Sequence, residues 1–181
     1  MSLFTLQPTS LQLQQATHFA NIYAENGFGK NVLNVSHDEY IHFIRIGKLC
    51  ELVLIHYLQK QDIAIEADEL LIPHAGKHKI GADFTLLHSQ QGVDVKAANK
   101  SFHKRILIRE DQFQAHIHDL YIGAKYIHDH QIDYYGYMTG HMMKQIVPQD
   151  FGHGMCRSMM LDDLKPISQL IDCCKKGMIV S

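Results

Sequence analysis

The sequence lacks a long hydrophobic run, a paired cysteine motif and a basic leader. Its 181 residues contain no stretch of about 18 uncharged apolar residues, so we expect no membrane-spanning helix and no membrane partner. The first residues lack the basic region that opens a secretory signal peptide. The four cysteines show no C-x-x-C spacing, and two of them are the neighbours Cys173 and Cys174. A reducing, cytoplasmic location is therefore the simplest expectation.

Linkers, internal repeats and low-complexity tracts are missing as well. With 46% hydrophobic and 20% charged residues, the composition is typical of a folded globular chain and excludes a disordered one. We therefore expect a single domain over residues 1–181. Within it we expect a core at about residues 39–140, an N-terminal helix at 9–26 and a C-terminal helical extension at 141–181.

The net charge of −2 conceals a local excess of basic residues. Between Lys77 and Arg109 there are seven Lys or Arg residues and only two acids, Asp83 and Asp94. A local positive field favours a polyanionic partner, although solvated Lys-rich loops give the same pattern. The residues that we expect to contact the phosphates of a nucleic acid are Lys77, Lys79, Lys100, Lys104, Arg105 and Arg109.

Helix signals occur at four places. The capping box Ser36-His37-Asp38-Glu39 precedes a long amphipathic stretch and predicts a helix over Tyr40–Gln61. An earlier helix is expected from Thr9 or Ser10 to Glu25. Two later helices are expected from Glu110 or Asp111 to about Asp129, and over Leu161–Cys174, where Pro166 lies in the first turns or marks the true start.

Short β-like segments lie between these helices. They are Ile63–Ala67, Ile80–Leu87, Val93–Ala97, Arg105–Ile108 and Ile132–Thr139. The order of elements predicts an α/β fold with a mixed central sheet flanked by helices. The early strands are expected to be antiparallel, and the last strand is expected to follow a helical crossover.

Three acidic residues occupy positions that are unusual for acids. Glu51 lies on or beside the apolar stripe of the long helix, so it needs a partner, which can be a metal ion or simply Lys48. Asp83 interrupts an otherwise apolar strand. Asp94 and Lys96 are two residues apart in the next strand, so their side chains share one face.

These acids point to metal chemistry. Neighbouring strands lie about 4.8 Å apart, so Asp83 and Asp94 can meet and share a divalent cation. Hard cations such as Mg²⁺ take carboxylate ligands and leave room for a phosphate, and Mn²⁺ is expected to substitute. Lys96 would then orient or deprotonate the attacking water, or stabilise the charge of the transition state.

The same residues resemble a known group of enzymes. Gly47-Lys48-Leu49-Cys50-Glu51, Gly81-Ala82-Asp83 and Asp94-Val95-Lys96 look like the motifs of the PD-(D/E)XK, or restriction-endonuclease-like, nuclease superfamily. The likeness covers roughly residues 39–140 and implies an αβββαβ core with metal-dependent hydrolysis of phosphodiesters. It implies that Asp83 and Asp94 hold the metal, that Glu51 assists the metal or binds water, and that Lys96 is catalytic. Ala82 stands where the motif's name has proline.

The sequence thus supports a Mg²⁺-dependent endonuclease acting on DNA, without a small-molecule cofactor and working as a homodimer. Its site is Glu51, Asp83, Asp94 and Lys96, with Gln112 and Gln114 as secondary candidates. The alternative is a non-catalytic nucleic-acid-binding or assembly protein that retains the nuclease fold. In that alternative Asp94 and Lys96 form a surface ion pair and Glu51 is a boundary residue. A zinc-stabilised module is the third interpretation, with ligands among His116, His118, His128 and His130.

Overall fold

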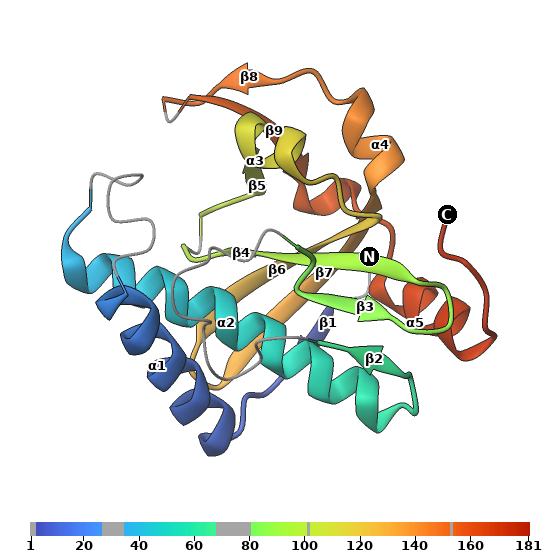
Figure 1. Ribbon diagram of the computed structural model, residues 1–181, viewed down its shortest axis with the longest axis horizontal. Coiled ribbons are helices and arrows are strands. Elements are labelled where there is room, and N and C mark those ends of the chain that lie inside the picture. Colours follow the sequence, from blue (N-terminus) through green and yellow to red (C-terminus); the bar gives the residue numbers. More distant parts are fainter. Residues whose placement is uncertain (1–2, 27–34, 68–80, 101, 153) are drawn as a thin grey trace.

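The computed structural model describes residues 3–26, 35–67, 81–100, 102–152 and 154–181 (Figure 1). It is a mixed α/β structure with two sheets. The large sheet is curled and has the strand order β1-β7-β6-β4-β3-β2, and the small sheet has the order β5-β9-β8. The expectation of a mixed central sheet flanked by helices is therefore confirmed.

The large sheet is antiparallel except for one central pair. Strand β4 runs parallel to β6, whereas every other neighbouring pair is antiparallel. The bounds of its strands are β1 Phe4–Leu6, β2 Ile65–Glu66, β3 Phe84–Leu86, β4 Gln91–Ala98, β6 Leu120–His128 and β7 Gln131–Thr139. Between β4 and β6 the chain leaves the sheet and forms β5 and α3.

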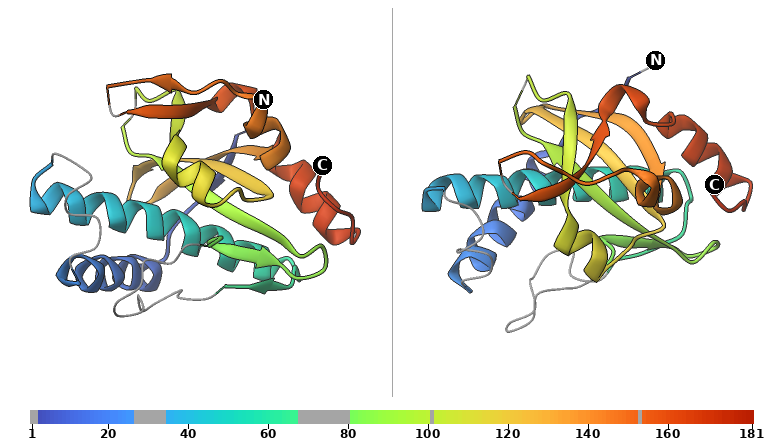
Figure 2. Two further views of the ribbon diagram at one scale, coloured as in Figure 1. Left: turned by 45° about the horizontal axis from the view of Figure 1, so that its top comes forward. Right: turned by 90° about the horizontal axis from the view of Figure 1, so that it is seen from above.

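The small sheet is formed by β5 and by two strands from the C-terminal part of the chain. Its strands are β5 Arg105–Arg109, β8 Gln149–Asp150 and β9 Met155–Met160, and β9 pairs antiparallel with both neighbours. Short helices accompany it, namely α3 Glu110–Ala115, α4 Gly140–Gln145 and the 3₁₀ turn η1 Leu161–Asp163. Figures 1 and 2 show this small sheet on one side of the large sheet, opposite α1 and α2.

Two long helices cover the other side of the large sheet. α1 spans Ser10–Glu25 and α2 spans His37–Lys60, and each begins with a complete capping box. The Thr9 and Ser36 hydroxyls accept the N–H groups of Gln12 and Glu39, and the side chains of these two residues return the bond. Both helices were predicted, and the capping box at Ser36 was the signal for α2, because it is local and needs no tertiary context.

The core is divided between the two faces of the large sheet. One hydrophobic cluster joins the sheet to α2 and to α5, which spans Ile167–Lys175. The second cluster joins the sheet to the small sheet with α3, α4 and η1. Val93 and Val95 of β4 belong to the first cluster, so the alternating side chains of Asp94 and Lys96 point to the other face.

The predicted helix over residues 110–129 is wrong beyond its first six residues. Only Glu110–Ala115 is helical, and Leu120–His128 forms the central strand β6. Leu120, Tyr121 and Ile122 are all buried because both faces of this strand are covered. Such a continuous apolar run has no period-2 alternation, so periodicity alone does not distinguish it from a buried helix.

Other predicted elements change their place or length. Arg105–Ile108 is a strand as expected, but it pairs with β9 in the small sheet and does not extend the large one. The last helix starts after Pro166, and residues 141–181 also contain β8 and β9, so this region is mixed rather than helical. The strand Met155–Met160 has no β-branched residue, and it forms because β5 supplies a partner.

Candidate active site

One cleft of about 780 Å³ brings the four predicted site residues together. Glu51 enters it from α2, Asp83 from the residue before β3, and Asp94 and Lys96 from β4. We call these four residues the acid–lysine cluster. They come from three separate elements, so their meeting at one cleft is a property of the tertiary fold.

The hairpin of β3 and β4 fixes the carboxylate of Asp83. The backbone N–H of Asp83 donates to the carbonyl of Val93 at 2.8 Å. In return, the N–H of Val95 donates to Oδ2 of Asp83 at 2.7 Å. Phe84 lies opposite Val93 in the ladder, so Asp83 lies beside Asp94 where the two strands meet.

Asp94 and Lys96 form a largely buried ion pair. Nζ of Lys96 lies 3.0 Å from Oδ2 of Asp94, and the side chain of Asp94 is only 8% exposed. The Lys96 side chain is 31% exposed and reaches the cleft. This pair therefore differs from the surface ion pair that the non-catalytic alternative supposes.

Glu51 already has a partner in its own helix. Its Oε2 is ion-paired with Nζ of Lys48, one turn earlier. Lys48 also lies over the ring of Phe19 in α1, with Nζ 4.3 Å from the ring centroid. Glu51 is thus the boundary residue paired with Lys48 that the sequence allowed, and it also lines the cleft beside the aspartates.

The acid–lysine cluster carries excess negative charge. Burial raises the pKa of Asp83 well above its usual value, and the charges of Glu51 and Asp94 raise it further. Lys96 and the Val95 N–H oppose this rise only in part. Burial disfavours the ammonium of Lys96, but the carboxylates of Asp94, Asp83 and Glu51 outweigh that effect and raise its pKa. Lys48 pairs with Glu51 and Lys96 with Asp94, so Asp83 is the acid of the cluster without its own lysine, and a cation beside it would relieve the repulsion.

The donor atoms of the cluster suit a hard divalent ion. Carboxylate oxygens are the ligands that Mg²⁺ and Mn²⁺ prefer, and Asp83 and Asp94 are adjacent. Among the described residues, however, no group of three or more His, Cys, Asp or Glu side chains is placed to hold a metal ion. The described histidines, which the third interpretation takes as zinc ligands, form no such group either. The cluster therefore fits a metal by donor type, without a complete cage.

No family model matches this chain. No curated protein matches it either. No helix in the described ranges is both long and apolar enough to cross a bilayer. The residues of the cleft are therefore the basis on which a function is assigned.

A second cavity of about 460 Å³ lies against the same cluster. Asp83, Asp94 and Lys96 line both hollows, so they form a wall between them. The other side of the second cavity includes Gln112, His116, His118 and Tyr121. The sequence predicted a helix over this segment and gave these histidines as zinc ligands or as ordinary polar residues, with no link to the acid–lysine cluster.

His118 lines this cavity, and its pKa is lowered there. Its backbone N–H donates to the Tyr121 hydroxyl at 3.1 Å, and its ring stacks with that of His116 at 6.4 Å between centroids. Burial lowers the pKa of His118, and Lys96 lowers it while Asp94 raises it. Gln112 also lines this cavity, whereas Gln114 donates to Glu110 at 2.7 Å and lines neither hollow.

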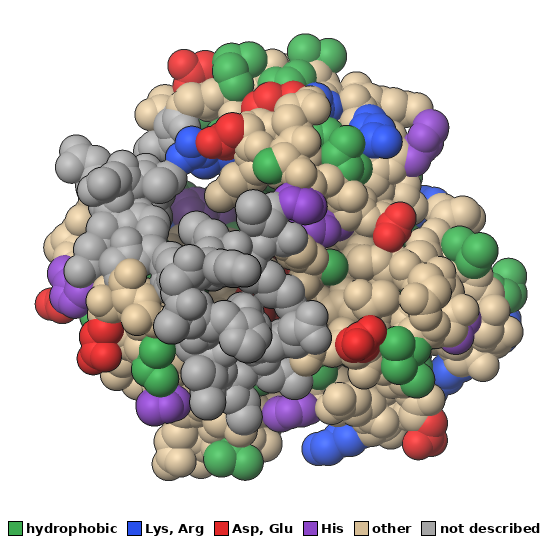
Figure 3. Space-filling view, viewed as in Figure 1, with side chains coloured by type: hydrophobic (Ala, Val, Ile, Leu, Met, Phe, Trp, Pro, Cys, Tyr) green, Lys and Arg blue, Asp and Glu red, His purple; other side chains and the backbone are tan. Residues whose placement is uncertain are grey.

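The predicted phosphate contacts differ in their surroundings. Lys104 and Arg105 are exposed and line the cleft, and Lys100 lies beside its rim near Phe102. Arg109 is ion-paired with Asp111 at 2.6 Å and lines neither hollow. Lys77 and Lys79 lie outside the described residues. On the face drawn in Figure 3, the described Lys and Arg side chains are dispersed among acids and form no continuous basic patch.

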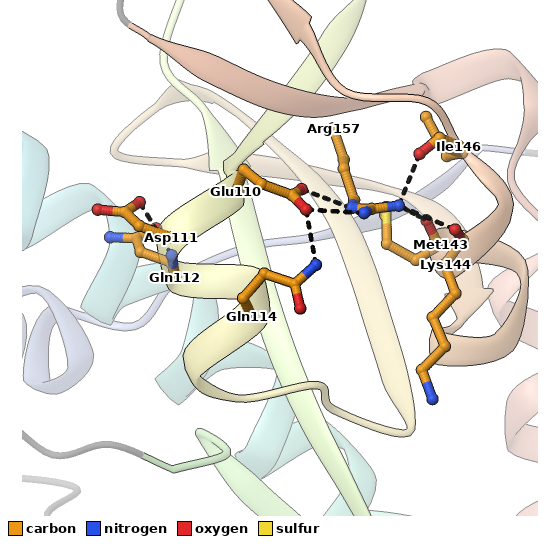
Figure 4. A network of polar contacts seen from close by, with 8 residues as sticks. All are labelled: Glu110, Asp111, Gln112, Gln114, Met143, Lys144, Ile146 and Arg157. Carbon is orange, nitrogen blue, oxygen red and sulfur yellow. Dashed lines mark hydrogen bonds and ion pairs between the residues drawn. The ribbon is translucent and has the colours of Figure 1, made fainter.

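A buried arginine holds the elements behind the second cavity. Arg157 of β9 donates to both carboxylate oxygens of Glu110, at 2.7 and 2.8 Å (Figure 4). Its Nη1 donates to the carbonyls of Met143, Lys144 and Ile146 at the end of α4. Arg157 thereby fixes α3 against β9 and α4, and α3 in turn carries Gln112 into the second cavity.

Proposed function

We propose that this protein is a Mg²⁺-dependent nuclease of the restriction-endonuclease-like type that hydrolyses DNA phosphodiester bonds in the cleft. The observation that supports this proposal most strongly is that one cleft is lined by four residues from three elements, namely Glu51, Asp83, Asp94 and Lys96. The electrostatic coupling within this cluster supports the proposal, because burial and mutual repulsion leave an acid site that a cation would neutralise.

The topology supports the same proposal. α2 is followed by the three antiparallel strands β2, β3 and β4, then by a crossover, and then by β6 parallel to β4. Apart from the additional strand β5 in the crossover, this succession is similar to the αβββαβ order that the resemblance implies. The sequence predicted strands where β3 and β4 lie, but it took Arg105–Ile108 as the third strand and Ile132–Thr139 as the last, where the structure has β2 and β6. The two aspartates lie at adjacent strands of this unit.

The chemistry of the cluster assigns each residue a role. Asp83 and Asp94 would hold Mg²⁺, which supplies positive charge to the phosphate and activates water when bound. Lys96 has a raised pKa and is therefore an ammonium at neutral pH. In the metal-free protein it is therefore able to donate hydrogen bonds to a phosphate or to the attacking water. Glu51, which is ion-paired with Lys48, supplies a carboxylate on the α2 side of the cleft.

A non-catalytic binding protein is the second candidate. It is favoured by one observation: the carboxylates of Glu51, Asp83 and Asp94 each already have a protein partner. In that case the ion pairs hold the fold together and the cleft binds DNA without cutting it. The two candidates differ in whether the acids bind a metal.

Calorimetric titration with Mg²⁺ and Mn²⁺ tests the nuclease proposal. Wild type is expected to bind the metal, and Asp83→Asn is expected to lose binding while keeping its circular dichroism spectrum. Metal binding that is unchanged in Asp83→Asn would contradict the site.

A nicking assay on supercoiled plasmid tests catalysis. Lys96→Ala is expected to lose cleavage by about two orders of magnitude or more, the usual cost of removing one transition-state donor. Lys176→Ala, at an exposed lysine after α5, is the matched control and is expected to cut like wild type. Equal cleavage by wild type and Lys96→Ala would remove the proposed role of this lysine.

A further inference from the structure

An exposed aromatic side chain stands on the connection between β4 and β5. Phe102 is 71% exposed, yet it lines the same cleft as the acid–lysine cluster. A phenyl ring left in water at a concave site gains free energy when a flat apolar surface covers it. Nothing among the described residues buries this ring.

The neighbours of Phe102 are cationic or polar. Nζ of Lys100 lies 5.8 Å from its ring centroid, and the ring of His103 meets it edge to face at 4.9 Å. Lys104 and Arg105 follow in the chain, are exposed, and line the cleft as well. We call the described residues Lys100 and Phe102–Arg105 the rim. It presents one aromatic face among positive charges.

The lining of the cleft combines two kinds of chemistry. Asp94 and Lys96 of the acid–lysine cluster lie on β4, and the rim follows the end of that strand. A DNA strand with an anionic linkage at the cluster and a base at the rim would match both parts of the lining. A groove that combines basic side chains with an exposed aromatic ring is typical of single-strand binding, because every base has a π face.

A continuous duplex does not satisfy this arrangement. In a duplex each base is stacked between its neighbours, so a protein side chain meets only base edges and phosphates. The cleft volume of about 780 Å³ lies within the range of sites that take small ligands, and suits a few nucleotide units. DNA whose bases are already free offers the π face that this ring lacks as a partner.

We propose that Phe102 is a stacking platform for an unpaired base, so that the substrate is single-stranded DNA or DNA with a single-stranded segment beside the scissile phosphate. This inference rests on the proposed nuclease function for its scissile phosphate, but the binding that it describes needs no metal. Lys100, Lys104 and Arg105 contact the phosphates on either side of the stacked base.

Fluorescence anisotropy with the metal chelated tests the platform separately from cleavage. The probes are a labelled oligodeoxythymidine strand and a labelled mixed-sequence duplex of the same length. Wild type is expected to bind the strand more tightly than the duplex. Phe102→Ala is expected to lose about 5- to 100-fold in affinity for the strand, with its affinity for the duplex unchanged.

Two variants make the result specific to stacking. Phe102→Trp keeps an aromatic face and is expected to bind the strand at least as tightly as wild type. Val147→Ala removes apolar surface at a residue that is 74% exposed and does not line the cleft, and is expected to change nothing.

The outcomes separate this inference from the nuclease proposal. Equal affinity of wild type and Phe102→Ala for the strand, or no binding of the strand by folded wild type, overturns the platform. Loss of strand binding in Phe102→Ala and its retention in Phe102→Trp support the platform even if neither the plasmid nor a single-stranded circle is cut with Mg²⁺ or Mn²⁺ present, in which case only the nuclease proposal fails.

Discussion

At the scale of single residues, Asp83 is a buried acid whose charge costs stability. Its carboxylate is buried among other acids, and its pKa is raised first by burial and then by Glu51 and Asp94. A raised pKa means that the folded state holds this proton more tightly than the unfolded chain does. The contribution of Asp83 to stability therefore falls as the pH rises from the unfolded pKa of about 4 through the folded pKa.

Asp83→Asn is accordingly expected to stabilise the metal-free protein at neutral pH, because the amide keeps an oxygen for the Val95 N–H and removes the charge. Thermal unfolding measures this, and a gain of 1 kcal/mol corresponds to about 2–4 °C for a chain of this size. Asp172→Asn, at an exposed acid in α5, is the control and should leave the midpoint unchanged. A lower midpoint for Asp83→Asn would show that the carboxylate is structural.

Arg157 shows the opposite case, in which a buried charge is fully partnered. It bonds Glu110 through two nitrogens, donates to three carbonyls, and lies over the ring of Phe113 at 4.4 Å. Arg157→Met leaves these carbonyls and Glu110 without their donor. We expect it to cost about 3 kcal/mol in the free energy of unfolding by urea at neutral pH.

The pH dependence of the stability lost in Arg157→Met tests the ion pair between Arg157 and Glu110. The bond to Arg157 lowers the pKa of Glu110, so this pair stabilises the fold above the unfolded pKa of glutamate, about 4.3. The stabilisation is lost as the pH falls through the lower, folded value. The difference between wild type and Arg157→Met should therefore shrink in acid, and a difference that is constant down to strongly acid pH would contradict the pairing.

At the scale of elements, α2 contains a glycine that packing does not require. A Cβ added at Gly47 would meet no atom within 4 Å, and Gly47 lines the cleft one turn before Glu51. Gly47→Ala is expected to raise the free energy of unfolding by about 0.5–1 kcal/mol, because alanine loses less backbone entropy in a helix. Urea titration measures this gain.

Gly123 in β6 is the matched contrast. A Cβ there would lie 2.4 Å from Cδ1 of Leu164 and 3.2 Å from Cδ2 of Leu161, so Gly123→Ala is expected to destabilise the protein. If both alanine variants change stability in the same direction, the packing described around these two glycines is wrong.

Elements with local signals were predictable, and those that depend on distant partners were not. The capping box at Ser36 and the alternation of Val93 to Ala97 located α2 and β4, and with them three of the four cluster residues. Asp83 was found because it interrupts an apolar run. The segment Leu120–His128 was misread because its burial on both faces comes from neighbouring layers. Because of that error, the second cavity with His116 and His118 was not predicted. Phe102 was not predicted either, although the sequence shows it as an aromatic residue within a basic run.

At the scale of the whole molecule, one wall of the cleft comes from β5 of the small sheet, which follows β4 along the chain. Lys104 and Arg105 are exposed cations that line the cleft, and we propose them as phosphate contacts. Lys104→Ala and Arg105→Ala are each expected to weaken binding of any DNA sequence and to lower the slope of log affinity against log salt by about 1.

Arg109→Ala is the control for this salt titration, because Arg109 is held by Asp111 and lines neither hollow. Its slope should equal that of wild type. A slope that falls equally in all three variants would indicate that DNA approaches over another surface.

The homodimer stays a prediction, and sedimentation velocity at micromolar protein tests it directly.

The small sheet also determines at which point of synthesis the cleft can form. β5 leaves the sheet straight after β4, but its only partner strand in the described structure, β9, is made much later in the chain. While the protein is being synthesised, the wall that carries Arg105 and Ile106 therefore has an open edge, even after the acids and Lys96 have been made. The nascent chain cannot complete this wall of the cleft until β9, which ends at Met160, has been synthesised, so the acid–lysine cluster is made well before the groove beside it can be ordered.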